Sequence, residues 1–385
     1  MVEGSGDRSA PARARALAPM LAQAAARIER ERELPQDVLA AMHEARLFRM
    51  ALPRSVGGLE LDLPAIVEAV EAVARGDASA AWCLGQGTGC ALAAAYLEPV
   101  AAREIFGAED SVLAWGAAVQ ARAVAVPGGY RVTGTWMFAS GSRHATWIGA
   151  HCSVFEADGT QRPQPRTMLF PRAVAGMQDT WRVIGLRGTG SDSYAANDLF
   201  VPAAHSIERD TPRERRERGP LYLFPTSGVY APCFAGVALG IARSLLDDLI
   251  RLAHVKTPRG FSKTLRESQV AQMQIGQAEA KLGAARIFLH HTVAEVWAEV
   301  ARTGALTLDR RVAIRLAATH AIGQATEVSE FAYKAAGASA VFEDAPFERR
   351  FRDAHAVSQQ VQGRLSHFET VGRHLLGLEI DATFL

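Results

Sequence analysis

Hydrophobic residues recur at helical spacing in the first and last parts of the chain, and at shorter, strand-like spacing in between. In the first part, apolar residues three and four apart predict an amphipathic helix over residues 12–31, with Pro19 in its first turn. Further helices are predicted over residues 35–47, over residues 63–74, and from residue 77 onward. Asp77 is the expected N-cap of the fourth helix, because its carboxylate can accept from free N–H groups of the first turn.

Three glycines interrupt this fourth helix. Gly85, Gly87 and Gly89 lie two residues apart, and glycine is unfavourable inside an ordinary helix. Two interpretations are open: the glycines allow another element to pack closely, or they leave room for a ligand. The pattern alone favours neither.

The middle of the chain has the pattern of a β structure. From residue 111 to residue 209 the apolar runs are short, and prolines punctuate them. The segment from Pro127 to Tyr130 is typical of a hairpin turn between two strands. We therefore expect a β-barrel or β-sandwich of roughly a hundred residues.

The last part of the chain returns to helical spacing. Long helices are predicted over residues 229–255, 267–302, 308–336 and 346–372, and Gly337 is placed to end the third. Four such helices with short connections are typical of an antiparallel bundle. The predicted fold is α+β but mainly α, with an N-terminal helical domain (1–110), a central β-barrel or sandwich (111–225) and a C-terminal four-helix bundle (226–385).

Composition narrows the class of protein. The formal net charge of +1 gives no global field that would attract nucleic acid or a membrane surface, and 49% hydrophobic residues argue against a disordered chain. The four cysteines have no metal-binding spacing, so we expect free thiols and no metal site. No signal-peptide core and no run of about 18 apolar residues stands out, which predicts a soluble cytoplasmic protein without a membrane span.

One stretch of the β region suggests chemistry. Residues 134–147 begin as an aromatic strand and then turn through residues 140–142, whose small side chains let a backbone approach a planar group. His144 and Trp147 follow on the far side of the turn. A small β domain with such an edge, set between two helical blocks, predicts a large cofactor at the seam.

Three stretches together resemble the acyl-CoA dehydrogenase superfamily, and within it the two-component flavin-dependent monooxygenases. They are Gly-Thr-Trp-Met-Phe-Ala-Ser-Gly-x-x-His-Ala-x-Trp in residues 134–147, Gly-Leu-Arg-Gly-Thr-Gly-Ser-Asp in residues 185–192, and Pro-Phe-Glu-Arg-Arg-Phe-Arg-Asp-Ala-His in residues 346–355. The resemblance covers nearly the whole chain. It implies the order of helical domain, β domain and helical bundle predicted above.

The resemblance also implies a cofactor and partners. Reduced FMN or FAD would be delivered by a separate flavin reductase, and the substrates would be O2 and a small aromatic or natural-product-like molecule. A homotetramer is implied as well. The long apolar helices of the last domain fit it, since they carry more apolar surface than one bundle needs.

The same stretches contain candidate flavin-binding residues. Those for the apolar wall of the ring site are Trp136, Phe138 and Trp147. Ser140, with the backbone around Ala139, would meet the polar edge of the ring. Arg259 resembles a cation that approaches the flavin phosphate across the subunit interface in relatives. Each aromatic residue taken alone also has a core-packing interpretation, and Arg259 also fits an ordinary surface arginine.

Three residues are candidates for catalysis: His355, His144 and Ser140. His355 matches a histidine of many of these monooxygenases, where imidazole can transfer a proton near neutral pH. His144 matches the Ser-Gly-x-x-His pattern of the family, and Ser140 offers a hydroxyl near flavin N5. The alternatives are a packing or capping role for His355 and a structural hydrogen bond for His144.

The chain departs from the family pattern at three positions. Ala139 stands where many relatives carry a hydroxyl, and Gln360 stands where many carry a second histidine. Cys90 falls near a histidine position of the N-terminal domain. Cys90 and Gln360 are therefore candidate substrate-pocket residues that cannot replace histidine in proton transfer. These departures leave oxygenation at carbon, nitrogen or sulfur open.

Two other functions are open. A flavin-bound dehydrogenase needs a carboxylate base, but the position eight residues after Asp353 in one common type is here Val361. Asp247 and Asp248 lie where other relatives carry that glutamate, on a typical charged helix face. The sequence thus disfavours ordinary acyl-CoA dehydrogenation. A dehydrogenase or oxidase on a non-standard substrate, and a catalytically weakened or non-enzymatic member, stay as alternatives.

Overall fold

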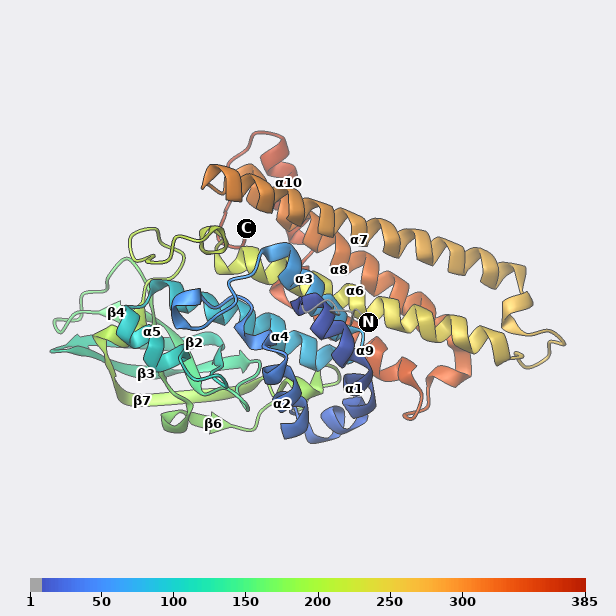
Figure 1. Cartoon of the computed structure of the whole chain (residues 1–385), viewed down its shortest axis with the longest axis horizontal. Helices are drawn as coiled ribbons and strands as arrows, with labels where there is room; N and C mark the ends of the chain where they lie inside the picture. Colours follow the sequence, from blue (N-terminus) through green and yellow to red (C-terminus); the bar gives the residue numbers. More distant parts are fainter. Residues whose placement is uncertain (1–8) are drawn as a thin grey trace, which may run out of the picture.

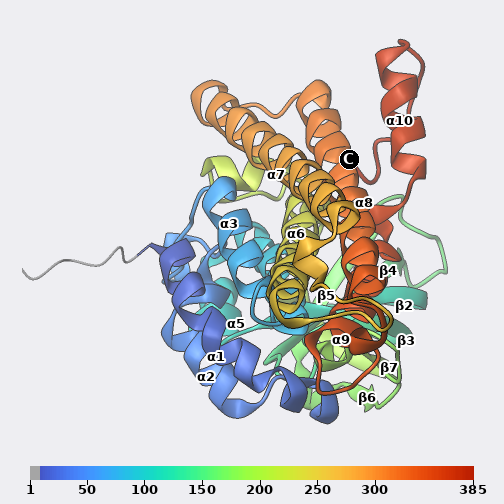
Figure 2. The same ribbon diagram turned by 90° about the vertical axis from the view of Figure 1, so that its right-hand side faces the viewer.

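A β-sheet and a bundle of long helices lie towards opposite ends of the molecule, with shorter helices between them (Figure 1). The computed structural model describes residues 9–385. Two large hydrophobic cores result: one is shared by the N-terminal helices and the bundle, and the other lies inside the sheet. A small third cluster contains Val312, Val371 and Leu385. The view turned by 90° shows the N-terminal helices gathered on one flank of the bundle (Figure 2). The candidate functional site lies where the two large cores adjoin.

The N-terminal part is helical, as predicted. Its helices are α1 (Ala10–Glu31), α2 (Gln36–Glu44), α3 (Leu63–Ala74), α4 (Ala78–Ala91) and α5 (Pro99–Phe106). The predicted N-cap of α4 is confirmed, since the Asp77 carboxylate accepts from the Ala80 N–H at 2.9 Å. The predicted place of Pro19 is wrong. Helix α1 begins earlier, with Ser9 as its cap and Pro11 in its first turn, so Pro19 lies inside the helix.

The central part is one continuous sheet. Its strands are β1 (Leu113–Trp115), β2 (Ala117–Val126), β3 (Gly129–Ala139), β4 (Trp147–Phe155), β5 (Arg166–Pro171), β6 (Gly176–Gln178), β7 (Asp192–Pro202) and β8 (Ser206–Ile207). The strand order is β6-β7-β3-β2-β4-β5-β8, and β1 pairs with β4. The predicted hairpin is confirmed between β2 and β3, with Gly128 at φ 80° in its turn. Strand β3, which carries the candidate site, is therefore central in the sheet.

The C-terminal part contains three long and two short helices. They are α6 (Thr226–Val255), α7 (Gln269–Thr303), α8 (Leu308–Ala336), α9 (Pro346–Ser358) and α10 (Ser366–Leu375). The helix predicted over residues 346–372 is thus two helices. Between them the chain makes a short 3₁₀ turn over Val361–Gly363, capped by the Gln360 side chain, which accepts from the Gln362 N–H at 2.6 Å. Helix α9 packs against α6 and α8 as the fourth helix of the bundle.

Helix α6 is the one helix in residues 9–385 that is long and apolar enough to cross a membrane, although the sequence suggested no such run. Its most apolar window has a mean hydropathy of 1.5, but 89% of that window is buried inside the protein. It contacts α3, α4, α8 and α9, which makes it the central helix of the main core.

The glycines of α4 allow close packing against α6. A Cβ atom on Gly89 would lie 2.2 Å from the ring of Tyr230, and a Cβ atom on Gly85 would lie 3.4 Å from Phe234. Of the two interpretations left open by the sequence, close packing is therefore the one that the structure supports at these two positions.

We expect Gly89→Ala to lower the free energy of unfolding by about 1–3 kcal/mol, because the added methyl group overlaps the Tyr230 ring. Chemical denaturation would measure the change. Gly276→Ala is the matched control, since Gly276 lies in α7 and nothing lies within 4 Å of an added Cβ there. The control should stabilise the helix by up to about 1 kcal/mol. Equal effects of the two substitutions would contradict the packing role of Gly89.

Candidate functional site

Two tight turns meet where the sheet contacts the helices. The first ends strand β3 and contains Phe138 at φ 61° and Gly141 at φ 80°. The second runs from Leu186 at φ 52° to Gly190 at φ 49°. Positive φ is strained for phenylalanine and leucine, and such strain is typical of functional sites. The turns bond directly, since the Gly141 N–H donates to the Thr189 carbonyl at 2.9 Å.

A chain of buried hydroxyl groups joins the two turns to α4. The Trp82 Nε1–H donates to Ser140 Oγ at 2.9 Å, and Ser140 Oγ lies 2.7 Å from Ser191 Oγ. Ser191 Oγ lies 2.7 Å from Thr189 Oγ1, which donates to the Leu186 carbonyl at 2.8 Å. Because each hydroxyl has one proton, the bonds run in one direction, from Trp82 to Leu186. Ser140 therefore donates to Ser191 and keeps one acceptor position for a ligand.

The sequence singled out Ser140 but not its partners. Trp82 gave no signal inside an alanine-rich helix, and Thr189 and Ser191 were recognised only as part of a tight turn. The alternation of glycine and hydroxyl residues in that turn is the signal that points to them.

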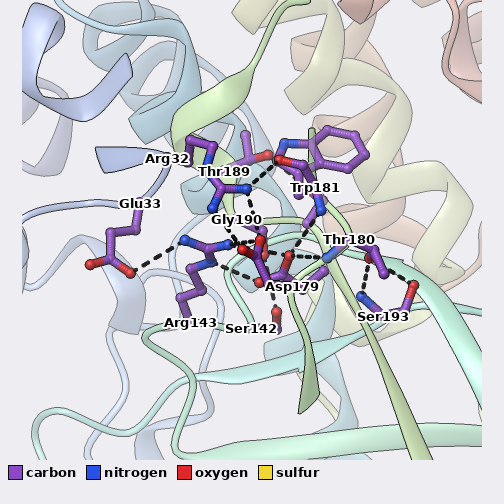
Figure 3. A network of polar contacts seen from close by, with 12 residues as sticks. Arg32, Glu33, Ser142, Arg143, Asp179, Thr180, Trp181, Thr189, Gly190 and Ser193 are labelled. Atoms are coloured by element: carbon purple, nitrogen blue, oxygen red, sulfur yellow. Dashed lines mark hydrogen bonds and ion pairs between the residues drawn. The ribbon is translucent and has the colours of Figure 1, made fainter. Parts of the chain in front are cut away.

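Charged residues hold the outer side of the two turns (Figure 3). The Arg143 Nε–H donates to Asp192 at 2.7 Å, and its Nη2 donates to Asp179 at 2.9 Å. Asp179 also binds Arg32 at the end of α1, at 2.7 Å. Hydrogen bonding from Arg32 lowers the pKa of Asp179 to about 2. This network fixes the turns of the sheet to the first helix.

Helix α9 holds the second turn from the other side. The Leu186 N–H donates to the Asp353 carboxylate at 2.6 Å, and a Cβ atom on Gly185 would lie 2.3 Å from the Arg352 carbonyl. Burial raises the pKa of Asp353 to about 7, although the Leu186 N–H opposes the shift. The buried carboxylate of Asp77 raises the pKa of Asp353 further. The candidate site is thus enclosed by α1, α4, α9 and the sheet.

His144 lies beside the first turn but cannot carry a proton at neutral pH. Its ring packs over Gly141, with 3.1 Å between Nε2 and the position of an added Cβ, and Nε2 is buried without a partner. Burial lowers its pKa to about 3, and the nearby His43 lowers it further. His144 therefore offers a neutral imidazole for packing or hydrogen bonding.

His355 lies on the face of α9 that is turned towards α8. Its ring contacts Phe351 at a centroid distance of 4.4 Å, and Phe351 stacks on Tyr333 of α8. Asp353, which binds the second turn, is two residues away and therefore on nearly the opposite face of the helix. The structure thus does not bring His355 onto the hydroxyl chain. Its Nε2 atom is nevertheless buried and has no partner among the described residues.

The three aromatic wall candidates lie in different surroundings. Trp136 is fully buried in the sheet core, where it stacks on Tyr194 at 5.2 Å and donates to the His151 carbonyl, so core packing accounts for it. Trp147 is half-buried and meets His205 edge to face. Phe138 is 60% exposed and next to Ala139, whose side chain is buried. Phe138 meets Trp181 edge to face at a centroid distance of 6.1 Å and is the wall candidate that is exposed beside Ser140.

The substrate-pocket candidates lie apart from each other. Cys90 is buried in α4, where its thiol lies 3.5 Å from the Tyr230 hydroxyl and Gln86 approaches it at 3.8 Å. Burial raises the pKa of the Cys90 thiol to about 12, so it stays protonated. Gln360 is at the end of α9, where its side chain caps a turn. Only Cys90 lies on the α4–α6 side of the seam.

Arg259 lies far from the other candidates. It is exposed in the loop between α6 and α7, at the end of the bundle remote from the sheet (Figure 1). Within one chain it does not meet Ser140. Among residues 9–385 no cluster of three metal-binding side chains exists, and all four cysteines are free and buried.

The seam, which is the region where the two turns meet α4 and α9, has features that suit a planar cofactor with polar edges. It offers an exposed aromatic face at Phe138 and a buried hydroxyl with a free acceptor position at Ser140. Beside the first turn, the buried Nε2 atom of His144 has no partner among the described residues. Buried polar atoms are normally hydrogen-bonded, so a bound ligand could supply the partner that His144 Nε2 lacks.

Relatives of known activity match most of the chain. Residues 12–101 match the family described as acyl-CoA dehydrogenase, N-terminal domain, and residues 232–362 match acyl-CoA dehydrogenase, C-terminal domain. An indole-3-acetate monooxygenase from Pseudomonas putida is 31% identical over 86% of this chain and 84% of that protein. XiaF from Streptomyces sp., solved in complex with FADH2 and glycerol, has a TM-score of 0.90 and 26% identity over 98% of this chain and 97% of that one. The 3-HSA hydroxylase from Rhodococcus sp. RHA1 has a TM-score of 0.89 and 25% identity over 97% and 98%.

We expect Ser140→Ala to lower the free energy of unfolding by about 1–3 kcal/mol, because it leaves the buried Trp82 N–H and Ser191 without their partner. Denaturant titration would measure it. Ser329→Ala is the matched control, since the Ser329 hydroxyl is equally buried but has no hydrogen-bond partner among the described residues. That control should be close to neutral. If Ser140→Ala left the free energy of unfolding unchanged, the hydroxyl chain would not be what holds the turns.

Asp353→Asn should flatten the dependence of stability on pH. Because the folded-state pKa is raised from 3.8 to about 7, this group's contribution to stability is full below the ordinary pKa and is lost as pH rises towards 7. Asparagine keeps an oxygen for the Leu186 N–H but carries no charge. The variant should therefore be more stable than wild type at about pH 8, by on the order of 1 kcal/mol or more.

Denaturation curves at about pH 5 and about pH 8 measure this difference. Asp381→Asn is the control, because Asp381 is exposed and hydrogen bonds from Thr383 lower its pKa below 3.8. Its substitution should leave the pH slope in this range unchanged. If Asp353→Asn also left the dependence of stability on pH unchanged, the raised pKa would not belong to Asp353.

Proposed function

Because the chain belongs to the acyl-CoA dehydrogenase superfamily and is one of its two-component flavin-dependent monooxygenases, we propose that the seam around Ser140 is the site where reduced flavin and an aromatic substrate meet. As the oxygenase component, the chain works with a separate flavin reductase. The main support for placing the flavin site here is the exposed Phe138 next to the buried Ser140 hydroxyl. Both lie on a strained turn that neighbouring helices hold in place.

Reduced flavin, when bound, supplies the electrons with which one oxygen atom of O2 is transferred to the substrate. The residues proposed to hold it are Phe138, against the face of the ring, and Ser140, at its polar edge. The backbone N–H groups of residues 140–142 already donate to the Phe138, Thr189 and Ala139 carbonyls. Ser140 Oγ donates to Ser191 and keeps one free acceptor position on this turn. An acceptor suits the N5–H of reduced flavin better than the bare N5 of oxidised flavin.

His355 is proposed as the residue that exchanges a proton with the substrate or with the leaving oxygen. Its unpartnered Nε2 and its enclosed position on α9 support this role. His144 is proposed only as a hydrogen-bonding group, because its lowered pKa removes it from proton transfer. The enclosing helices would keep water away from the reacting groups.

The substrate is proposed to be an aromatic compound of the indole type. The relative from Pseudomonas putida is named for indole-3-acetate, and it covers most of this chain. On the substrate side of the seam, Cys90 and Tyr230 present a thiol and a hydroxyl beside aromatic rings. Gln360 is proposed to act through the end of α9 and not by contact with the substrate.

We also propose a homotetramer in which Arg259 acts in the site of another copy. The loop between α6 and α7, which contains Arg259, lies at the end of the bundle remote from the sheet, and this supports a role outside the site of its own chain (Figure 1). Exposed apolar residues on α7, Val270, Met273 and Ile287, offer a surface for such an assembly.

A dehydrogenase is disfavoured by the state of the two carboxylates that could act as its base. Asp247 is bound to Arg243 at 2.7 Å and to Arg75 at 2.9 Å. Asp248 is bound to Arg251 and Arg350. Each carboxylate is thus occupied by two arginine side chains, which leaves it less free to reach a substrate.

The proposal is tested by supplying the purified protein with a flavin reductase and its nicotinamide electron donor, FMN or FAD, indole and isotopically labelled O2. We expect one labelled oxygen atom in the product, detected by mass spectrometry, and no turnover without the reductase. Tightly bound oxidised flavin together with dye reduction by an acyl-CoA would instead support the dehydrogenase.

In the same assay, His355→Asn should lower kcat by roughly 100-fold or more if its imidazole transfers a proton. His291→Asn is the control, because His291 is exposed on α7. A normal kcat for His355→Asn would remove His355 from the mechanism without affecting the assignment of the reaction.

A further inference from the structure

Arg209 is a half-buried cation that has no acidic partner. In residues 9–385 no carboxylate lies within ion-pair distance of it, whereas the neighbouring Arg166 binds Glu214 at 2.6 Å. Its Nε–H donates to Thr167 Oγ1 at 3.0 Å, and this is its one hydrogen bond within the described chain. A guanidinium has five N–H donors, so both Nη groups are left for something else.

The guanidinium lies over an aromatic surface. Its central carbon is 5.0 Å from the ring centre of Trp115, which in turn meets His151 edge to face at 5.1 Å. Trp115 is buried, while His151 is half-buried. Burial lowers the pKa of His151 well below its ordinary value, and the charge of Arg209 lowers it further, so this histidine is neutral and does not compete for an anion.

An aromatic wall connects this arginine to the proposed flavin site. Trp82, which binds Ser140, stacks on Phe234 at 4.1 Å, and Phe234 stacks on Tyr230 at 5.3 Å. Gln86 then bridges to the Trp115 carbonyl at 3.5 Å. Arg209 lies over Trp115 and is therefore at the end of this wall.

We propose that Arg209 is a substrate-recognition residue, and that the substrate is an aromatic acid whose short side chain ends in a carboxylate. The aromatic wall would hold the ring, and the two free Nη groups of Arg209 would bind the carboxylate. Guanidinium and carboxylate groups match in a planar, two-bond geometry, and the flanking Trp115 ring fixes the guanidinium plane. This inference rests on the proposed function, since it assigns the substrate class of the same site.

The test compares indole-3-acetate with indole, which lacks the carboxylate. In the reductase-coupled assay, wild type should have the higher kcat/KM for indole-3-acetate. Arg209→Gln should lower kcat/KM for indole-3-acetate by roughly 30-fold or more, mainly through KM, and should change that for indole by less than about 3-fold. Arg209→Lys should fall between, because lysine keeps the charge but not the two-bond geometry.

Arg122→Gln is the matched control. Arg122 also lies over an aromatic ring, that of Phe155 at 5.3 Å, but it is exposed on β2. It should leave both substrates unaffected. Equal losses on both substrates for Arg209→Gln would show a structural role and overturn the proposal, as would no loss on either.

Ligand-induced thermal stabilisation gives a readout that does not depend on turnover. Indole-3-acetate should raise Tm of the wild type but not of Arg209→Gln, and indole should act equally on both. If the wild type binds the acid through Arg209 but oxygenates neither compound, the proposed reaction fails while the recognition role stands. If indole-3-acetate stabilises both proteins equally, the recognition role fails whatever the activity.

Discussion

The site depends on hydrogen bonds between two strained turns. Neither Phe138 nor Leu186 would adopt positive φ by itself, since each costs on the order of 1 kcal/mol or more in that conformation. The bond from Gly141 to Thr189 and the hydroxyl chain through Ser140 hold both turns in this form. The strained backbone conformation turns the Phe138 side chain toward solvent while Ser140 stays buried.

Elements distant in sequence converge on these turns. The end of α1 reaches them through Arg32, α4 through Trp82 and α9 through Asp353. A change in the conformation of the turns would therefore alter contacts with three helices. The buried carboxylate of Asp353 is the most sensitive of these links, since burial raises its pKa into the range where its charge changes near neutral pH.

The two sides of the seam have different chemistry. The side of Ser140 and Phe138 combines hydroxyl groups with one exposed ring, which suits a polar, planar cofactor. The other side runs along stacked rings to the unpaired Arg209, which suits an apolar ring with an anionic end. In the proposed arrangement, this division separates cofactor binding from substrate choice. Substitutions on the substrate side can thus change specificity and leave the oxygen chemistry in place.

The sequence by itself determined the kind and order of the elements, because hydrophobic periodicity, the Asp77 cap and the proline and glycine signals are local. It also led to Ser140 and Phe138 through their motif. It did not determine that Trp136 is core, that Asp353 and not His355 faces the turns, or that Arg209 has no acidic partner within residues 9–385. These facts depend on which side chains meet across long sequence separations. Only the tertiary structure decides them, since burial and pairing are properties of contacts and not of residue types.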